Sequence, residues 1–198
     1  MSKIEALNLI GNTPMVHLKT LDPKPGVEIY AKLEFLNPTG SYKDRIIQYM
    51  VKKGVETGKI NSNTTLVEGS SGNTGASVSM VASSMGLKSI IFVPDKCSDE
   101  KVAIIRSYGA EVIVIPTPES YEDAAANKAK EHENYYHINQ YNSPLNPEAH
   151  YMTTGKEIWD DMNGKINVFV ATASTGGTIS GIAQLLKEKD PKVKIIGL

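Results

Sequence analysis

The chain has 198 residues, of which 40% are hydrophobic and 22% are charged, which is typical of an ordinary globular protein. Its 21 Lys and Arg residues nearly balance its 22 Asp and Glu residues, so we expect neither nucleic acid nor a membrane as a partner. The only cysteine, Cys97, cannot form an internal disulfide, and no signal pattern opens the chain, which favours a cytoplasmic protein.

Short runs rich in Val and Ile alternate with helical patterns along the chain. The predicted strands cover residues 28–35, 64–68, 89–93, 111–115, 168–172 and 194–197. The predicted helices cover residues 45–58, 75–86, 98–110, 121–133, 148–162 and 178–190. Because parallel strands need a crossover between them, this alternation predicts an α/β fold of mostly parallel, twisted sheets with helices on both faces. Ligands of such sheets bind at the carboxyl ends of strands, so the strand-to-helix loops are expected to carry the binding and catalytic residues.

The first such loop reads NPTGSYKDR over residues 37–45 and places Lys43 in the first turn of a predicted helix. The positive end of a helix disfavours an ammonium, so the helix field, with any burial, favours the neutral amine. A neutral amine can attack an aldehyde, so Lys43 is a candidate for holding a carbonyl cofactor covalently. The alternative is a solvated surface lysine, which is the common case for this residue type.

The second loop reads EGSSGNTG over residues 68–75, between a predicted strand and a helix of small residues. Its backbone N–H groups can converge on an anion, helped by the positive end of the helix. The alternative is a tight turn in which Gly72 and Gly75 supply only unusual backbone angles, with Asn73 in a left-handed position.

The third loop reads TASTGGTISG over residues 172–181 and again joins a strand to a helix. Two adjacent glycines flanked by Thr175 and Thr178 are typical of a cup for one phosphate group. The loop lacks the ending of a nucleoside triphosphate loop and the spacing of a dinucleotide loop, so neither ligand is favoured. A glycine-rich turn without a ligand remains the alternative here.

Together and in this order, the three loops resemble those of the tryptophan-synthase-like, fold type II pyridoxal phosphate (PLP) enzymes. The resemblance is closest to the cysteine synthase and cystathionine β-synthase branch. It extends from about Leu9 to Leu198 and includes the segments LIGNTPMVHL, VPDKCSDEKVAIIRSYGAEV and INQYNSPLNPEAHY.

The resemblance implies a role for each loop residue. Lys43 would bind the cofactor's aldehyde and later take the substrate's α-proton, and Asn73 would contact the cofactor's 3-hydroxyl. The residues implied for the substrate carboxylate are Ser70, Ser71, Gly72, Thr74 and Gln140. Those implied for the cofactor phosphate are Ser174, Thr175, Gly176, Gly177 and Thr178. No metal site is expected.

Two positions depart from the usual pattern of this branch, which has threonine where this chain has Ser70 and glycine where it has Ser174. The residue opposite the pyridine nitrogen lies in a part of the family's fold beyond Leu198 and cannot be named. The last predicted strand has no helix after it, so we expect that the C-terminal part of the larger domain is missing. Residues 39–140 would form a smaller mobile domain, and residues 1–38 with 141–198 an incomplete larger one.

The reaction implied by the resemblance is β-replacement on serine, O-acetylserine or cysteine, with a thiol or sulfide as the second substrate. The product would be cysteine, cystathionine or a related amino acid. The alternatives are β-elimination, including release of hydrogen sulfide from cysteine, and a binding module without the cofactor. The resemblance and the apolar loop faces also suggest a homodimer.

Overall fold

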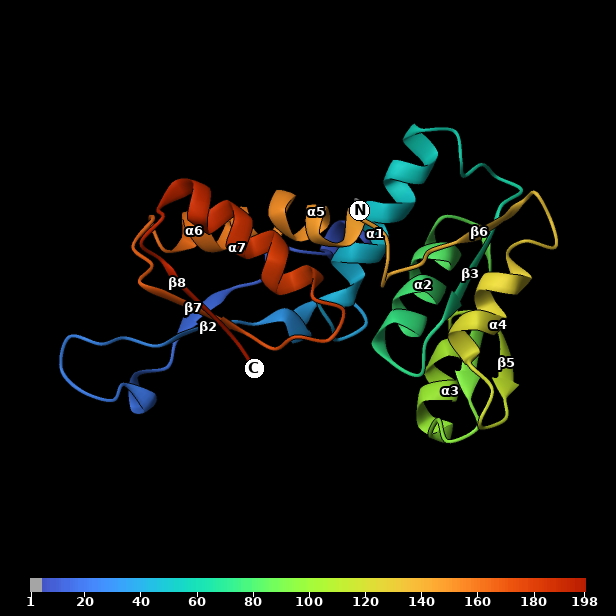
Figure 1. Cartoon of the computed structure of the whole chain (residues 1–198), viewed down its shortest axis with the longest axis horizontal. Helices are drawn as coiled ribbons and strands as arrows, with labels where there is room; N and C mark the ends of the chain where they lie inside the picture. Colours follow the sequence, from blue (N-terminus) through green and yellow to red (C-terminus); the bar gives the residue numbers. More distant parts are fainter. Residues whose placement is uncertain (1–4) are drawn as a thin grey trace.

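The structure is a computed structural model that describes residues 5–198. Two lobes lie side by side in Figure 1, with helix α1 (Lys43–Glu56) between them. This helix packs against α2 (Asn73–Ser84) on one side and α5 (Leu145–Met152) on the other. The residue at the start of α1 therefore lies where the two lobes meet.

The first lobe is built on a four-stranded sheet in the order β5-β4-β3-β6, in which every neighbouring pair is parallel. Its strands are β3 (Thr65–Gly69), β4 (Lys88–Pro94), β5 (Glu111–Ile115) and β6 (Tyr135–His137). Helices α1, α2 and α3 (Asp99–Ser107) contribute to the core on one face, and α4 (Tyr121–Lys128) covers the other. The carboxyl end of the central strand β3 leads directly into α2.

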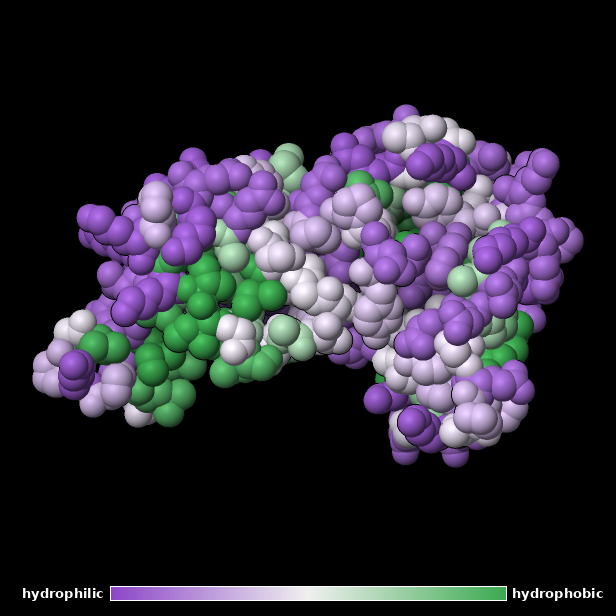
Figure 2. Space-filling model, viewed as in Figure 1, coloured by the Kyte–Doolittle hydropathy of each residue, from purple (hydrophilic) through white to green (hydrophobic). Residues whose placement is uncertain are grey.

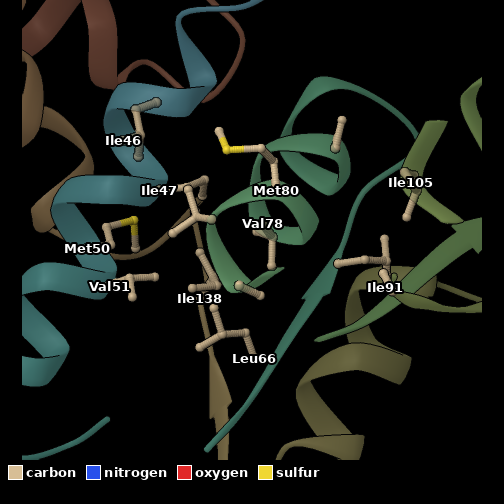
Figure 3. Close-up of a cluster of buried hydrophobic side chains, with 14 of the residues drawn as sticks. Ile46, Ile47, Met50, Val51, Leu66, Val78, Met80, Ile91, Ile105 and Ile138 are labelled. Carbon is tan, nitrogen blue, oxygen red and sulfur yellow. The ribbon is translucent and has the colours of Figure 1, made fainter. Parts of the chain in front are cut away.

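Alternate residues of the central strands serve the two faces, as the pleat of a β-strand requires. Leu66 and Ile91 belong to the larger core, while Val67 and Ile90 belong to the core beneath α4. Figure 3 shows the larger core, where α1 and α2 face each other above β3. Its labelled side chains are Ile46, Ile47, Met50, Val51, Leu66, Val78, Met80, Ile91, Ile105 and Ile138.

The second lobe contains two small sheets and three packed helices. Strands β1 (Met15–His17) and β2 (Tyr30–Lys32) are antiparallel, and β7 (Val168–Ala171) and β8 (Lys194–Gly197) are parallel. Helix α7 (Gly177–Lys189) connects β7 to β8 and packs against α5 and α6 (Thr154–Asp161). Short 3₁₀ helices span Ala6–Leu9, Lys19–Leu21 and Glu34–Leu36.

The predicted α/β class with mostly parallel sheets is confirmed, but several predicted elements were wrong in extent. The predicted strand 28–35 is reduced to β2 and pairs antiparallel with β1, which was not predicted. Strand β6 was also missed, since both unpredicted strands have only three residues. A pattern this short carries little periodic signal.

The predicted helix 148–162 is two helices that meet at Thr153, whose φ of -121° and ψ of -83° are not helical. The Thr153 hydroxyl donates to the carbonyl of Ala149 at 2.7 Å, and Thr154 Oγ1 lies 3.0 Å from His150 Nδ1. Side chains that bond to the preceding turn compete with the helical backbone pattern. This competition accounts for the break at Thr153, which Gly155 follows in the first turn of α6.

An apolar area lies over β7 and β8 and is green in Figure 2. Its exposed residues include Val168 at 46%, Val170 at 50%, Ile196 at 44% and Leu198 at 76%. Apolar side chains gathered on one face are typical of a surface that another structure covers. Within residues 5–198, no helix is long and apolar enough to cross a membrane.

Candidate active site

Lys43 is the first residue of α1, and its side chain is buried between the lobes. The residue is 7% exposed, and its Nζ has no hydrogen-bond partner within residues 5–198. Burial lowers the pKa of Lys43 to about 8, and the nearby Glu68 carboxyl only partly opposes this. The sequence predicted a lowered basicity from the helix field; the structure adds burial as the dominant cause. With this pKa, about half of the amine is neutral near pH 8.

Asp44 holds the loop that carries Lys43. Its fully buried carboxylate accepts hydrogen bonds from the Thr39 backbone N–H at 2.8 Å, the Thr39 hydroxyl at 2.5 Å and the Ser77 hydroxyl at 2.5 Å. Gly40, with a φ of +80°, makes the turn before the helix. These contacts tie the loop to both α1 and α2, so the Lys43 backbone is fixed from two sides.

Arg45 anchors the other side of the same turn. The Arg45 side chain is 1% exposed, and its guanidinium contacts Glu34 at 2.7 Å and Glu157 at 2.6 Å. Burial alone would raise the pKa of Glu157, but hydrogen bonds from Arg45 and Lys32 outweigh it and hold the pKa at about 2. Burial also opposes the charge of Arg45, yet its bonds to Glu157 and Glu34 raise its pKa above the usual value. The network joins α1 to α6 and to the 3₁₀ helix that precedes the loop.

The predicted carboxylate loop lies between the end of β3 and the first turn of α2. Ser70 and Thr74 are buried, and the Gly72 N–H donates to Ser70 Oγ at 3.3 Å. The Thr74 hydroxyl donates to Gln140 Oε1 at 2.7 Å, so the structure brings the loop and Gln140 into direct contact. Because the first N–H groups of a helix have no intrahelical acceptor, those at the start of α2 are available to an anion.

Glu68 is a site residue that sequence reasoning missed. It is 2% exposed and accepts a hydrogen bond from the Asn139 N–H at 2.8 Å. Burial raises the pKa of Glu68 to about 8, although hydrogen bonds from Asn139 and Gln140 and the positive charge of Lys43 act to lower it. The Glu68 carboxyl therefore interacts with the charge of Lys43. In the sequence, Glu68 comes two residues before Ser70. Its only sequence signal is a carboxylate at the end of an otherwise apolar strand.

The predicted phosphate cup precedes and begins α7. Gly176 adopts a φ of +80°, and a Cβ on Gly177 would overlap the side-chain amide of Asn146. Glycine is therefore required at both positions, by backbone angle at the first and by space at the second. A surface pocket opens here, and its lining includes Gln140, Asn146, Thr175, Gly176, Gly177 and Ser180.

Two residues of α5 link the cup to the rest of the site, and sequence reasoning missed both. Asn146 Nδ2 donates to the Gln140 carbonyl and to Thr175 Oγ1, both at 2.9 Å. His150 Nε2 lies 3.1 Å from Thr178 Oγ1. Four-residue spacing on a helix could have indicated that Asn146 and His150 share a face, but not which helix that face contacts.

The structure thus connects the three predicted loops by short contacts. Gln140 touches Thr74 on one side and, through Asn146, Thr175 on the other. The Lys43 loop joins them through Asp44, which accepts a hydrogen bond from Ser77 of α2, and through Tyr42, whose ring centroid lies 5.8 Å from that of His150. The side chains of Asn73 and Ser174 are exposed. Residues 5–198 contain no group of three or more His, Cys, Asp or Glu side chains placed to hold a metal ion.

The family model described as pyridoxal-phosphate dependent enzyme matches residues 6–198 of the chain. The chain is 43% identical to cystathionine beta-synthase of Saccharomyces cerevisiae, over 99% of this chain and 41% of that protein. It is 41% identical to cysteine synthase B of Salmonella typhimurium, over 96% of this chain and 63% of that protein.

A solved structure shows the same fold. The hydrogen sulfide-producing enzyme from Fusobacterium nucleatum superposes with a TM-score of 0.92 at 38% identity, covering 98% of this chain and 66% of that one. The chain therefore spans between about two fifths and two thirds of the length of these relatives. With a family model matched over residues 6–198 and this common fold, the chain belongs to the pyridoxal-phosphate dependent enzymes, in the cysteine synthase and cystathionine β-synthase branch.

Proposed function

We propose that the protein catalyses β-replacement on serine, O-acetylserine or cysteine with the help of PLP. The observation that carries the proposal is the buried amine of Lys43, which has no hydrogen-bond partner among the described residues and whose loop contacts α2 and the ring of His150. A buried amine without a hydrogen-bond partner is costly unless a ligand or reaction uses it.

The residues present suit a ligand that carries both an aldehyde and a phosphate. The cup at Thr175–Thr178 offers backbone N–H groups and two hydroxyls to the phosphate, and Gly176 has no side chain to obstruct its approach. Lys43 would bind the aldehyde, and Asn73 would contact the ring hydroxyl. When bound, PLP supplies an electron sink that stabilises negative charge at the α-carbon of an amino acid.

The chain's own residues would do the remaining work. The start of α2, with Ser70, Ser71, Gly72 and Thr74, would hold the substrate carboxylate, and Gln140 would fix the loop through Thr74. Lys43, once free and neutral, would take the α-proton, since its pKa of about 8 suits a base near neutral pH. Asp44 and Arg45 would keep Lys43 in position through their contacts with neighbouring elements.

The similar proteins support a sulfur amino acid as substrate or product. The names of two of them specify cystathionine beta-synthase and cysteine synthase B. We therefore propose that the second substrate is a thiol or sulfide, and that cysteine or cystathionine is the product. Serine, O-acetylserine and cysteine remain the candidate first substrates.

The experiment is cofactor uptake followed by product analysis. Purified protein mixed with PLP should gain a visible absorption band, and Lys43→Ala should lack it while still folding. The loaded protein is then offered each of the three amino acids, with sulfide or with homocysteine. Formation of cysteine or cystathionine supports the proposal, and a parent protein that takes up no cofactor contradicts it.

A second candidate is β-elimination that releases hydrogen sulfide from cysteine. It is favoured by the 38% identity to the hydrogen sulfide-producing enzyme of Fusobacterium nucleatum. Under this reaction, cysteine alone yields sulfide, and an added thiol forms no thioether. The same product analysis therefore separates elimination from replacement.

We also propose a division into a smaller mobile domain, residues 39–140, and a larger one formed by residues 1–38 with 141–198. The four-stranded sheet and the carboxylate loop fall in the first segment, and the phosphate cup falls in the second. A homodimer and a cytoplasmic location complete the proposal. Sedimentation of the purified protein and imaging of a tagged copy in the cell test these two points.

A further inference from the structure

Each of the two threonine hydroxyls in the phosphate cup contacts a side chain of α5. Thr175 contacts Asn146, and Thr178 contacts His150, with both α5 residues at 1% exposure or less. Asn146 and His150 are four residues apart, so they project from one face of the helix toward α7. A phosphate accepts hydrogen bonds, so the cup serves it only where the hydroxyl protons are free to be donated.

The direction of the Asn146 contact follows from its second partner. Asn146 Nδ2 donates to the Gln140 backbone carbonyl at 2.9 Å as well as to Thr175 Oγ1 at 2.9 Å. A carbonyl oxygen can only accept, so the amide nitrogen must face it. The buried Asn146 Oδ1 has no partner in the described part of the chain, which is consistent with an orientation set by the nitrogen. Thr175 Oγ1 is therefore an acceptor from Asn146, and its own proton stays free.

The imidazole of His150 is neutral and can adopt either of two tautomers. Burial, together with the positive charges of Arg45 and Lys43, lowers the pKa of His150 to about 3, while the charge of Glu34 opposes this shift. A neutral imidazole donates through one nitrogen and accepts through the other. If Nε2 carries the proton, it donates to Thr178 Oγ1 and leaves the Thr178 proton free. If Nδ1 carries the proton, Nε2 can only accept, and the Thr178 hydroxyl must donate its proton to Nε2.

The neighbours of Nδ1 favour the first form. Thr153 already donates its proton to the Ala149 carbonyl at 2.7 Å, so it is not the donor to Thr154. Thr154 Oγ1 lies 3.0 Å from His150 Nδ1 and 3.4 Å from Thr153 Oγ1, which makes the imidazole its nearer acceptor. A Thr154 hydroxyl that donates to Nδ1 requires the proton of His150 to be on Nε2.

We propose that Asn146 and His150 are positioning residues that orient the Thr175 and Thr178 hydroxyls as donors to a bound phosphate, with the His150 proton on Nε2. The inference rests on the proposed cofactor function of the cup. It adds that α5, and not the cup alone, determines how many donors the phosphate meets. It also makes the Thr153–Thr154 junction part of the site, since that junction places the donor to Nδ1.

The direct test is nitrogen NMR of ¹⁵N-histidine-labelled protein, with His150 assigned by its absence from the His150→Gln spectrum. The parent is measured alone, with inorganic phosphate and with PLP. Because protonated and unprotonated ring nitrogens differ widely in chemical shift, the spectrum reports the tautomer. We expect a proton on Nε2 in all three samples. A proton on Nδ1 in the sample with bound PLP overturns the inference and leaves the proposed function intact.

Matched variants test the consequence for binding, with inorganic phosphate and PLP as probes. Removing the hydroxyl in Thr178→Val should weaken phosphate binding about tenfold, while Thr178→Ser should stay close to the parent. His150→Gln can still donate to Thr178 and should bind phosphate better than His150→Leu, which cannot. Thermal unfolding checks that each variant is folded, and the NMR test on the parent stands whatever the variants do.

The outcomes separate the two claims. Equal phosphate affinity for Thr178→Val and Thr178→Ser, or for folded His150→Gln and His150→Leu, overturns the inference. A parent that takes up neither PLP nor phosphate overturns the proposed function itself, on which the inference rests.

Discussion

Lys43 combines three properties that a single surface lysine does not have. It begins a helix, it is buried, and its amine has no hydrogen-bond partner within residues 5–198. Each of these properties raises the free energy of the charged form. The positive end of the helix repels the ammonium, burial removes its water, and no acceptor replaces that water. Such a residue lowers the stability of the folded chain, which is the cost of a reactive amine at this position.

This cost predicts how Lys43→Met changes stability. The pKa of Lys43 falls from 10.5 to about 8 on folding, so between these values the unfolded chain binds more protons. The free energy of unfolding of the parent should therefore rise as the pH increases from about 8 to 10.5. This gain is lost again as the pH falls to about 8, below which Lys43 is charged in both the folded and the unfolded chain. Lys43→Met should be more stable than the parent at pH 7 by about 3 kcal/mol, and this advantage should shrink toward pH 10.

Urea unfolding at a series of pH values measures this difference. Lys52→Met, on the exposed side of the same helix, is the matched control and should follow the parent. The pKa of Glu68, raised to about 8, makes parent and variant both lose stability as pH rises toward 8, so only their difference is informative. A constant difference between Lys43→Met and the parent from pH 7 to 10 would contradict the account.

At the scale of elements, the site depends on how α1, α5, α6 and α7 pack. The loops were predictable because helix starts, glycine turns and strand ends are local features of the sequence. Glu68, Asn146 and His150 were not, because their importance depends on which helix lies opposite. The break at Thr153 was missed for a related reason, since it follows from side-chain bonds such as Thr154 to His150.

Arg45→Met should disconnect α1 from α6. The change leaves Glu34 and Glu157, whose side chains are each 18% exposed, without the buried cation that they share. Removing one partner of a buried ion pair costs about 3–5 kcal/mol, and we expect a loss toward the lower end of this range. Glu157 has a pKa of about 2 in the folded chain against 4.5 ordinarily, so its contribution is present above pH 4.5 and lost as pH falls through about 2. The destabilisation should therefore be largest near neutral pH and smaller in acid.

Chemical unfolding of the parent, Arg45→Met and Arg45→Lys at pH 7 and pH 3 checks this expectation. Arg45→Lys keeps the charge without the forked geometry and should lie between the other two. A loss under about 1 kcal/mol for Arg45→Met at pH 7 would mean that the network contributes little.

Gly181→Ala tests the contact between α5 and α7. A Cβ at this position would overlap the Pro147 carbonyl and lie 3.1 Å from His150 Cβ, so the two helices must separate. We expect a loss of about 2–3 kcal/mol and weaker phosphate binding, because α5 holds the cup threonines. Gln184→Ala, on the exposed side of α7, should change stability by less than about 0.5 kcal/mol. Unaltered thermal stability of Gly181→Ala would show that the helices do not pack this closely.

At the scale of the molecule, the site lies where the two lobes meet, so relative motion of the lobes would open and close it. The sequence predicted the α/β class because apolar strands and helices alternate over long distances. It failed for β1 and β6, whose three residues each are recognised only by their partners in the sheets. The exposed apolar face on β7 and β8 is likewise a property of the assembled lobe and not of either strand alone.

Binding of an amino acid to the PLP-loaded protein should draw residues 39–140 toward the phosphate cup. The reason is that the substrate carboxylate would be held by the start of α2 while the cofactor phosphate is held by α7, and these belong to different lobes. Small-angle X-ray scattering should show a smaller radius of gyration with serine than without it. An unchanged radius, with binding verified by absorbance, would contradict closure.

The central claim is that Lys43 is the residue that binds the cofactor's aldehyde, and covalent trapping tests it most directly. The PLP-loaded protein is reduced with sodium borohydride, digested, and sequenced by mass spectrometry to locate the pyridoxyl group. We predict the group on Lys43 and none on the protein in Lys43→Ala. A pyridoxyl group on another lysine, or a loaded protein with no modified lysine, would contradict the account.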